Sequence, residues 1–375
     1  MSSSPIVVDL FAGVGGLSLG ASRAGFHVKS AFEIDSKAIA SHVKNFPSSI
    51  HSDIDIGKLT GKDIFDISAI PTNALDGLIG GPPCQGFSYI GKRVLSDMRN
   101  DLFCHFFRLV KETKPKFFVV ENVPGILDKR YDELRGTAFN LVLDDYQIIG
   151  PLKVTASDYG APTIRTRIFY VGYDQKRFSK SLSSSDFHPH PEVEIVNVET
   201  GLMGLPTQIS PNWQTEELGW RKIEMQKIKN DFFGSRLFDK IPSNVGNLEA
   251  IRRLESNHEV SGFLGTVHSQ EIEKRYRDLK FGEQDKISKS TKLNPKGFCP
   301  TLRAGTGSDK GSFQAVRPIH YLHPRVISPR EAARLQGFPD WFTFHPTKWH
   351  SFRQIGNSVS PIVAEQILKV IFDRL

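Results

Sequence analysis

The segment PIVVDLFAGVGG, residues 5–16, decides the fold of this 375-residue chain. Its first half, Pro5 to Leu10, is a short apolar run, and its second half is a turn rich in glycine. A helical pattern follows from about Leu17 to Ala24. Short apolar runs that end at glycines are typical of buried strands. The segment therefore predicts a strand, a tight turn and a helix.

The same alternation continues through the first half of the chain. Apolar runs at 28–32, 74–79, 117–120 and 167–172 predict buried strands, and 101–111 predicts a helix. Strands that alternate with helices predict a doubly wound α/β sheet, in which ligands lie beyond the carboxyl ends of the strands. Four features stand at such strand ends: the glycine-rich turn, Glu33, Cys84 and Glu121.

The glycine-rich turn and two acids outline a nucleoside site. A dinucleotide-binding turn has a third glycine three residues after the second, and Ser18 stands at that position. A nicotinamide cofactor is therefore disfavoured. Glu33, twenty positions after Gly13, can accept hydrogen bonds from both ribose hydroxyls, and Asp53 can accept one from an adenine amino group. A nucleoside site without phosphate suits S-adenosylmethionine, although an ordinary turn with nearby surface acids is the alternative.

Cys84 is the candidate nucleophile. It lies in GGPPCQGFS, residues 80–88, directly after a predicted strand. The two prolines before it stiffen the backbone and would aim the side chain. An isolated cysteine is more often a small core residue, and this is the interpretation we favour for Cys104 and Cys299. The position of Cys84 at a strand end favours a functional role.

Glu121 is the candidate acid. It follows FFVV, residues 117–120, so we expect a partly desolvated carboxyl group with a raised pKa and an available proton. The three cysteines are far apart and include no Cys-x-x-Cys pair. Neither a zinc site nor a disulfide framework is therefore expected, and no metal ion is assigned to the chemistry.

The composition is that of a globular protein with a small excess of positive charge. Lys plus Arg number 48 against 41 Asp plus Glu, which gives a net charge of +7. The excess suits a polyanionic partner without requiring one. No apolar run approaches the roughly 18 residues of a membrane span, and no secretory signal opens the chain. We expect a soluble, unexported, cytoplasmic protein that does not interact with membranes.

The pattern changes near residue 178. A serine-rich stretch at 179–185 and the sequence HPHP at 188–191 interrupt the alternation. The basic stretch 274–296 is as compatible with a solvated loop as with phosphate contacts. Order returns near the end, where SPRE at 328–331 is a helix capping box. The apolar stripe of 361–371 predicts a last helix that docks on the α/β core.

Six ordered motifs resemble those of the DNA cytosine-5 methyltransferases across nearly the whole chain. DLFAGVGG (9–16) resembles the cofactor motif of that family, PPCQGFS (82–88) its nucleophile loop, and ENV (121–123) its acid motif. RTR (165–167) is similar to the motif that holds the flipped base, residues 325–338 to the motif around Pro-Arg-Glu, and QIGNSV (354–359) to the last motif.

The resemblance implies two domains. Residues 1–178 plus 350–375 would form a Rossmann-like, S-adenosylmethionine-dependent methyltransferase domain, and 179–349 a smaller, irregular target-recognition domain. Duplex DNA would lie in the cleft between them, with the target cytosine flipped out of the helix because its ring face must be reached. Specificity is expected between about 179 and 320, where side chains meet base edges.

Motif matching also assigns the site residues. Cys84, Glu121 and Arg165 are the expected catalytic residues, and Arg165 would orient the catalytic site and help position the cytosine. Arg167 is as much a structural as a catalytic candidate, and Thr163 stands where the family usually has Gln, so it is left out of the catalytic set. The residues expected to contact the cofactor are Phe11, Gly13, Gly15, Gly16, Glu33, Asp53, Ile54, Pro83, Leu102, Asn357, Ser358 and Val359.

The chemistry of the family needs a thiol and a carboxyl group together. A thiolate adds to carbon 6 of cytosine, which makes carbon 5 nucleophilic. An acid at ring N3 relieves the charge that would build up there. After methyl transfer a base removes the carbon 5 proton and the thiolate leaves, and no sequence feature identifies that base.

Two rival functions fit less well. Family members that act on tRNA carry Cys-Phe-Thr late in the chain, where this chain has LQGFP at 335–339. A DNA-binding protein without catalysis would not need Cys84, Glu121 and Arg165 together. The compact length favours a monomeric bacterial enzyme that acts on double-stranded DNA. Its methylation would protect host sites from a partner restriction endonuclease, without a stable complex between the two, and a solitary bacterial or phage enzyme is the alternative.

Overall fold

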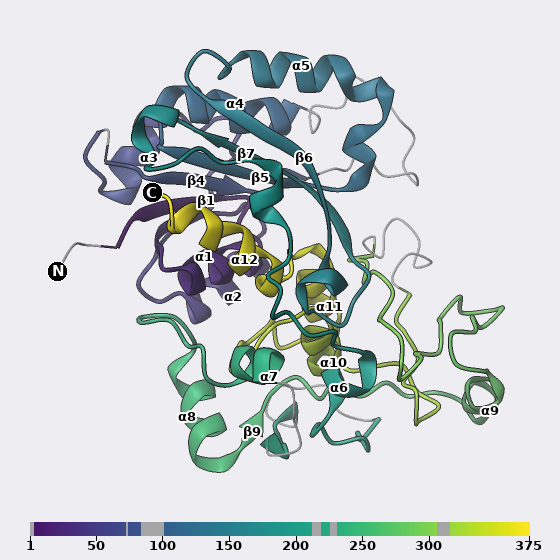
Figure 1. Ribbon diagram of the computed structural model, residues 1–375. Coiled ribbons are helices and arrows are strands. Elements are labelled where there is room, and N and C mark those ends of the chain that lie inside the picture. Colours follow the sequence, from purple (N-terminus) through teal and green to yellow (C-terminus); the bar gives the residue numbers. More distant parts are fainter. Residues whose placement is uncertain (1–3, 73, 84–100, 212–218, 226–230, 306–315) are drawn as a thin grey trace.

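The computed structural model describes residues 4–72, 74–83, 101–211, 219–225, 231–305 and 316–375. Seven strands form one sheet: β1 (Ile6–Leu10), β2 (His27–Phe32), β3 (Ile50–Ser52), β4 (Gly77–Gly80), β5 (Phe117–Asn122), β6 (Gln147–Thr155) and β7 (Thr166–Tyr173). Their order across the sheet is β3-β2-β1-β4-β5-β7-β6 (Figure 1). The pairs from β3 to β5 are parallel, whereas β7 is antiparallel to both β5 and β6.

Helices cover both faces of this sheet (Figure 1). α1 (Gly16–Ala24) and α12 (Pro361–Phe372) pack on one face, and α3 (Gly61–Ser68), α4 (Asp101–Thr113) and α5 (Asp132–Asn140) on the other. Strands that are covered on both faces bury side chains on both sides, which explains their continuous apolar runs. The predicted α/β architecture is confirmed.

The C-terminal helix α12 docks against α1, as its apolar stripe predicts. A Cβ atom placed on Gly20 of α1 would lie 2.2 Å from the Cβ of Ala364 in α12. The helices are therefore so close that only glycine fits at this position. Ile362 and Ile367 are buried in the core that α1 shares with the sheet. This contact brings the last motif of the chain back to the first.

The chain between 179 and 349 is mostly irregular in its described parts. None of the helices in the described ranges is long and apolar enough to cross a lipid bilayer. The remaining elements are α2 (Ser36–Asn45), α6 (Val198–Leu202), α7 (Asp231–Leu237), α8 (Leu248–Asn257), α9 (Gln270–Asp278), α10 (Pro329–Leu335), α11 (Lys348–Asn357), β8 (Arg221–Lys222), β9 (Glu259–Val260), and the 3-10 helices η1 (Pro124–Leu127), η2 (Lys129–Tyr131), η3 (Ala156–Tyr159), η4 (Gln175–Arg177) and η5 (Ser184–Phe187).

A second hydrophobic core joins this irregular part to the first half. Val14, Leu19 and Phe46 come from the glycine-rich turn, α1 and the end of α2. They pack in one cluster with residues such as Phe263 and Trp341, both fully buried. The glycine-rich turn therefore rests on the sheet on one side and on the second core on the other.

A buried ion pair holds the helix that follows the predicted capping box. The Ser328 side chain accepts from the backbone N of Glu331, and the Glu331 side chain accepts from the backbone N of Ser328. In α10, Arg334 is fully buried and donates to both carboxylate oxygens of Asp340, at 2.9 and 2.5 Å. Loss of either partner would leave a buried charge, so the pair fixes the path of this segment.

Two strands differ from the expectation drawn from the sequence. The apolar pattern does not predict β6, because Gly150 and Pro151 interrupt it and its pairing with β7 shifts register between Ile149 and Leu152. β5 continues through Asn122, so Glu121 lies inside the strand and not beyond its end. The antiparallel β7 begins beside this last part of β5.

Candidate active and cofactor site

The glycine-rich turn after β1 leaves an open position beside Glu33. Gly13 has a φ of +56°, and a Cβ atom there would meet none of the described atoms within 4 Å. Gly13 N donates to Oε2 of Glu33 at 2.9 Å, and Asp35 N donates to Oε1 at 2.7 Å. Two backbone donors thus hold the carboxylate in one orientation, with lone pairs left for the hydroxyls of a ligand. Burial raises the pKa of Glu33.

Gly15 and Gly16 allow close contacts that complete the turn. A Cβ atom on Gly15 would lie 2.4 Å from the ring of Phe46, and one on Gly16 would lie 2.3 Å from the carbonyl oxygen of Val359. The second contact joins the first motif to the last. Ser358 and Val359 are buried beside the turn, while Asn357, the last residue of α11, is exposed.

The other expected cofactor residues lie at neighbouring strand ends. Phe11 follows β1 directly with a φ of +60°. Asp53 and Ile54 follow β3, which pairs with β2, and Pro83 lies just beyond β4. Adjacent parallel strands end at the same edge of a sheet. Leu102, in the first turn of α4, and Phe11 pack against the same core.

Ile34 is a further candidate that the sequence pattern does not single out. Its side chain is 66% exposed directly after Glu33, and Ile54 after the neighbouring strand is 38% exposed. Exposed apolar side chains at adjacent strand ends can cover the flat face of an adenine ring. The available signal is an apolar residue next to a strand-end acid. Together with the open position at Gly13 and the oriented Glu33, these residues fit S-adenosylmethionine.

A buried chain of polar side chains lies beneath the cofactor turn. The Ser18 hydroxyl donates to Oδ2 of Asp9 at 2.5 Å. His42 Nε2 lies 3.0 Å from the same hydroxyl, and His42 Nδ1 lies 2.9 Å from Nε2 of His51. With Ser18 donating to Asp9, His42 donates to Ser18 and accepts from His51. Successive members of this hydrogen-bonded series lie 9, 24 and 9 positions apart in the sequence, so no local pattern reveals it.

Replacement of Asp9 with asparagine should change how stability depends on pH. Burial chiefly, and also Glu33, raises the pKa of Asp9 from 3.8 to about 7, against a lowering effect of Ser18. Above about pH 4 the unfolded chain has released a proton that the folded protein still holds. Wild-type stability therefore falls as pH rises to about 7, and this contribution then levels off.

The Asp9→Asn protein lacks this fall. Its free energy of unfolding minus that of the wild type should therefore increase between about pH 4 and pH 7, by about 4 kcal/mol at most. Urea unfolding of both proteins across this range measures the difference. A difference that is constant with pH would show that Asp9 does not titrate in the folded protein.

Glu121 and Arg167 form an ion pair where β5 meets β7. Arg167 Nε lies 2.7 Å from Oε1 of Glu121, and both side chains are largely buried. A Cβ atom on Gly81 would lie 3.1 Å from Oε2 of Glu121, so the segment that leads to the predicted nucleophile loop passes beside the carboxylate. The sequence left Arg167 between a structural and a catalytic role, and the geometry gives it the direct contact with the acid.

Arg165 donates a hydrogen bond to a different part of the chain, although its charge also interacts with that of Glu121. Its side chain is 3% exposed, and Nη1 donates to the carbonyl oxygen of Leu302 at 3.2 Å. Burial and the neighbouring Arg167 lower the pKa of Arg165. Thr163, in the position where the resemblance leads one to expect Gln, donates from its hydroxyl to the carbonyl oxygen of Cys299 at 3.1 Å. Both residues thus fasten the segment before β7 to the segment at 299–302.

The structure describes the surroundings of two of the three cysteines, Cys104 and Cys299. Cys84 lies outside the described residues. Cys299 is fully buried, and burial raises the pKa of its thiol, as expected of a core residue. Cys104 is partly buried on α4 and packs against the core beneath the sheet. Within the described part of the chain, no group of three or more His, Cys, Asp or Glu residues could hold a metal ion.

Comparisons with known proteins agree with this geometry. Residues 6–373 match the family model of the C-5 cytosine-specific DNA methylases. The Type II methyltransferase M.XorII of Xanthomonas oryzae pv. oryzae is 39% identical over 98% of this chain and 85% of that protein. The Type II methyltransferase M.DdeI of Desulfomicrobium norvegicum is 31% identical over 97% of this chain and 88% of that protein.

Solved structures show the same fold. A protein of E. coli described as a DNA modification methyltransferase encoded within a prophage has 53% identity and a TM-score of 0.88, with 99% of each chain covered. The Dnmt2 methyltransferase of S. pombe, at 17% identity, shares the fold with a TM-score of 0.62 over 99% of each chain. The chain therefore belongs to the C-5 cytosine-specific DNA methylase family, as an enzyme that uses S-adenosylmethionine to methylate DNA.

Proposed function

We propose that this methylase acts through a covalent bond between Cys84 and carbon 6 of a cytosine flipped out of duplex DNA. The observation that carries the proposal is the ion pair between Glu121 and Arg167, which lies beside Gly81. An acid held in one orientation thus stands next to the segment that leads to Cys84. A thiol and a carboxyl group placed together are what this reaction needs.

Each residue of the proposed site acts at a stated atom. The Cys84 thiolate bonds to carbon 6, and the electrons of the ring double bond become available at carbon 5. Glu121 donates a proton to ring N3, and Arg167 stabilises the carboxylate that this step leaves. Arg165 helps to position the cytosine. When carbon 5 has gained its methyl group and lost its proton to a base, ring N3 returns its proton to Glu121, the bond to sulfur breaks and the thiolate leaves.

The cofactor would lie across the carboxyl ends of β1 to β4. S-adenosylmethionine supplies the methyl group as an electrophile. Glu33 accepts from the ribose hydroxyls, and Asp53 accepts from the adenine amino group. The remaining proposed contacts come from the turn, the neighbouring strand ends and the last motif: Phe11, Gly13, Gly15, Gly16, Ile54, Pro83, Leu102, Asn357, Ser358 and Val359.

The same proposal extends to the organisation of the chain. Residues 1–178 plus 350–375 would carry out catalysis, and 179–349 would read the DNA sequence. M.XorII and M.DdeI are Type II methyltransferases, which supports a role in protecting host sites from a partner endonuclease. The enzyme would act in the cytoplasm as a monomer, without a stable complex with that endonuclease.

Incubation with labelled S-adenosylmethionine tests the substrate class. Purified protein is given either duplex DNA or tRNA, and the label in each is counted after removal of the cofactor. We expect label in DNA and none in tRNA. Label in tRNA alone would overturn the proposal and favour the RNA-methylating alternative.

A further inference from the structure

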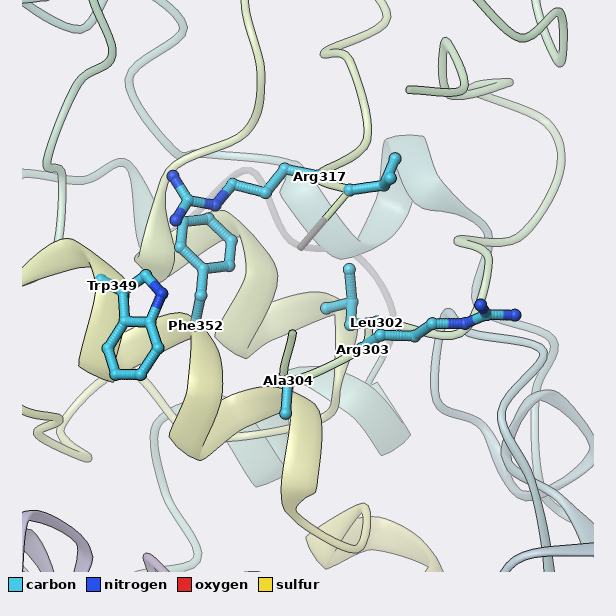
Figure 2. A pocket seen from close by; sticks show the side chains of 7 residues that line it. Leu302, Arg303, Ala304, Arg317, Trp349 and Phe352 are labelled. Carbon is cyan, nitrogen blue, oxygen red and sulfur yellow. The ribbon is translucent and has the colours of Figure 1, made fainter. Parts of the chain in front are cut away.

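A small cavity lies where residues 302–304 and 316–317 pass over α11. Seven side chains line it, among them Arg317, Trp349 and Phe352 (Figure 2). Its volume is about 10 Å³, which holds about one water molecule. The cavity is therefore too small for a cofactor or a base. A cationic side chain, that of Arg317, is part of its lining.

Arg317 lines this cavity, and Lys348 directly precedes Trp349, another lining residue, in α11. The guanidinium carbon of Arg317 lies 4.1 Å from the centre of the Phe352 ring, and Figure 2 shows the group stacked on that ring near Trp349. Lys348 precedes Phe352 by four residues in α11, so both side chains project from the same side of the helix. The Arg303 side chain, by contrast, points away from the cavity (Figure 2).

The two cations have no acidic partner among the described residues. Lys348 Nζ donates only to neutral groups, the carbonyl oxygen of Gly265 at 2.5 Å and the hydroxyl of Thr266 at 3.0 Å. Nε of Arg317 is buried and has no hydrogen-bond partner in the described chain. Burial lowers the pKa of Arg317 to about 10, and burial together with Arg317 lowers that of Lys348 to about 8. An anion between them would relieve the repulsion.

The simpler interpretation is that Arg317 merely packs on Phe352. The attraction between a guanidinium and the face of an aromatic ring stabilises such a stack by itself and needs no ligand. That interpretation leaves two cations, Arg317 and Lys348, whose charges interact without an acidic partner among the described residues. An arginine stacked on a ring keeps its N–H groups in one plane, as binding of a phosphate requires. The pair is better explained as part of a binding site.

The wall of the cavity is connected to the proposed active site. The carbonyl oxygen of Leu302 accepts from Arg165, which we assign to the flipped base. A Cβ atom on Gly356 of α11 would lie 2.6 Å from the backbone N of Ala304. The segment 302–304 therefore links the cavity to Arg165 on one side and to the last cofactor motif on the other. A flipped base held by Arg165 would bring the DNA backbone, which is a polyanion, close to this segment.

We propose that Arg317 and Lys348 together bind one backbone phosphate of the DNA, close to the flipped nucleotide. The proposal rests on duplex DNA as the substrate and on Arg165 as a residue that holds the base. A phosphate contact fixes the position of the duplex but carries no sequence information. It releases one condensed counterion, so its loss flattens the plot of log K against log salt concentration by about 0.9.

Salt titrations of DNA binding test this site. The wild type and the Arg317→Gln/Lys348→Gln protein are titrated with two duplexes of different sequence at several potassium chloride concentrations. We expect the slope to flatten by about 0.9 in total with both duplexes, because a single phosphate is lost. An unchanged slope would overturn the proposal. So would a flattening of about 1.8, which indicates two separate phosphates, or a loss confined to one sequence.

Matched variants separate this site from a general effect of charge or folding. Arg177→Gln/Lys369→Gln removes the same charge from two exposed residues outside the proposed DNA-reading segment, which pair with Asp174 and Asp373, and its slope should equal that of the wild type. Arg317→Lys keeps the charge and should keep the slope. Equal S-adenosylmethionine binding and equal thermal midpoints show that the variants are folded. A wild type that bound no DNA would refute the proposed function instead.

Discussion

The Cys84→Ala protein is expected to transfer no methyl group to DNA while it still binds S-adenosylmethionine. The sulfur forms the bond that makes carbon 5 nucleophilic, and a methyl side chain cannot form it. Removal of a covalent nucleophile costs on the order of 10⁶-fold in turnover in a well-studied protease, so activity should fall below detection. Labelled methyl transfer to duplex DNA measures this, with calorimetry of cofactor binding in parallel.

Cys104→Ala is the matched control for this substitution. Cys104 lies on α4 and packs against the core, so its loss should leave most of the turnover in place. Measurable turnover in the Cys84→Ala protein would show that another group is the nucleophile. Loss of turnover in a folded Cys104→Ala protein would show that the nucleophile had been assigned to the wrong cysteine.

The Glu121→Gln protein should show a kcat lower by about 10²- to 10⁴-fold, the usual contribution of a positioned acid or base. An amide N–H is too weakly acidic to transfer a proton to ring N3, and the amide cannot form the ion pair that Glu121 makes with Arg167 at 2.7 Å. Affinity for the cofactor should be retained, because the proposed ribose contact is made by Glu33. Single-turnover methyl transfer at saturating DNA and cofactor measures the effect.

Three further variants help to interpret this result. Arg167→Gln should also lower kcat and should shift the pH profile of the reaction, because Arg167 acts through Glu121 as a positioning residue. Arg167→Lys should restore part of the rate. Glu249→Gln, an exposed acid that pairs with Arg252 and Arg253 on α8, should leave kcat unchanged. If Glu121→Gln behaves like Glu249→Gln, Glu121 is not the acid.

Features with a local cause could be predicted from the sequence. The strand, turn and helix of residues 5–24 depend on an apolar run followed by glycines, and both are visible in the chain. The capping box at Ser328 and Glu331 lies within four residues. The apolar stripe of α12 predicted its docking, because a helix with such a face must be covered.

Features that depend on strands meeting in space could not be predicted. Arg167 reaches Glu121 only because β7 runs antiparallel beside β5, and no pattern in the sequence gives the direction of that strand. β6 was not predicted because Gly150 and Pro151 interrupt its pattern of apolar residues. Arg165, two residues before Arg167, bonds to Leu302 instead of to the acid. Motif matching makes Arg165 the stronger catalytic candidate, whereas the structure places Arg167 in direct contact with Glu121.

Around the proposed cofactor site, too, a local feature could be predicted and a long-range one could not. Glu33 could be found by counting from Gly13, and the bond from Gly13 N to its carboxylate agrees with that spacing. The chain from Asp9 through Ser18 and His42 links three elements that meet only in the folded protein. Its members are polar residues of ordinary appearance in the sequence, and burial alone makes them notable.

Duplex DNA with tritium at carbon 5 of its cytosines provides the most direct test of the central claim. A methyl group can enter carbon 5 only if the hydrogen there is displaced, whereas methylation of a cytosine nitrogen leaves that hydrogen in place. We expect one tritium to be released to water for each methyl group transferred by the wild type, and none by the Cys84→Ala protein. Methyl transfer to the DNA without release of tritium would contradict the account.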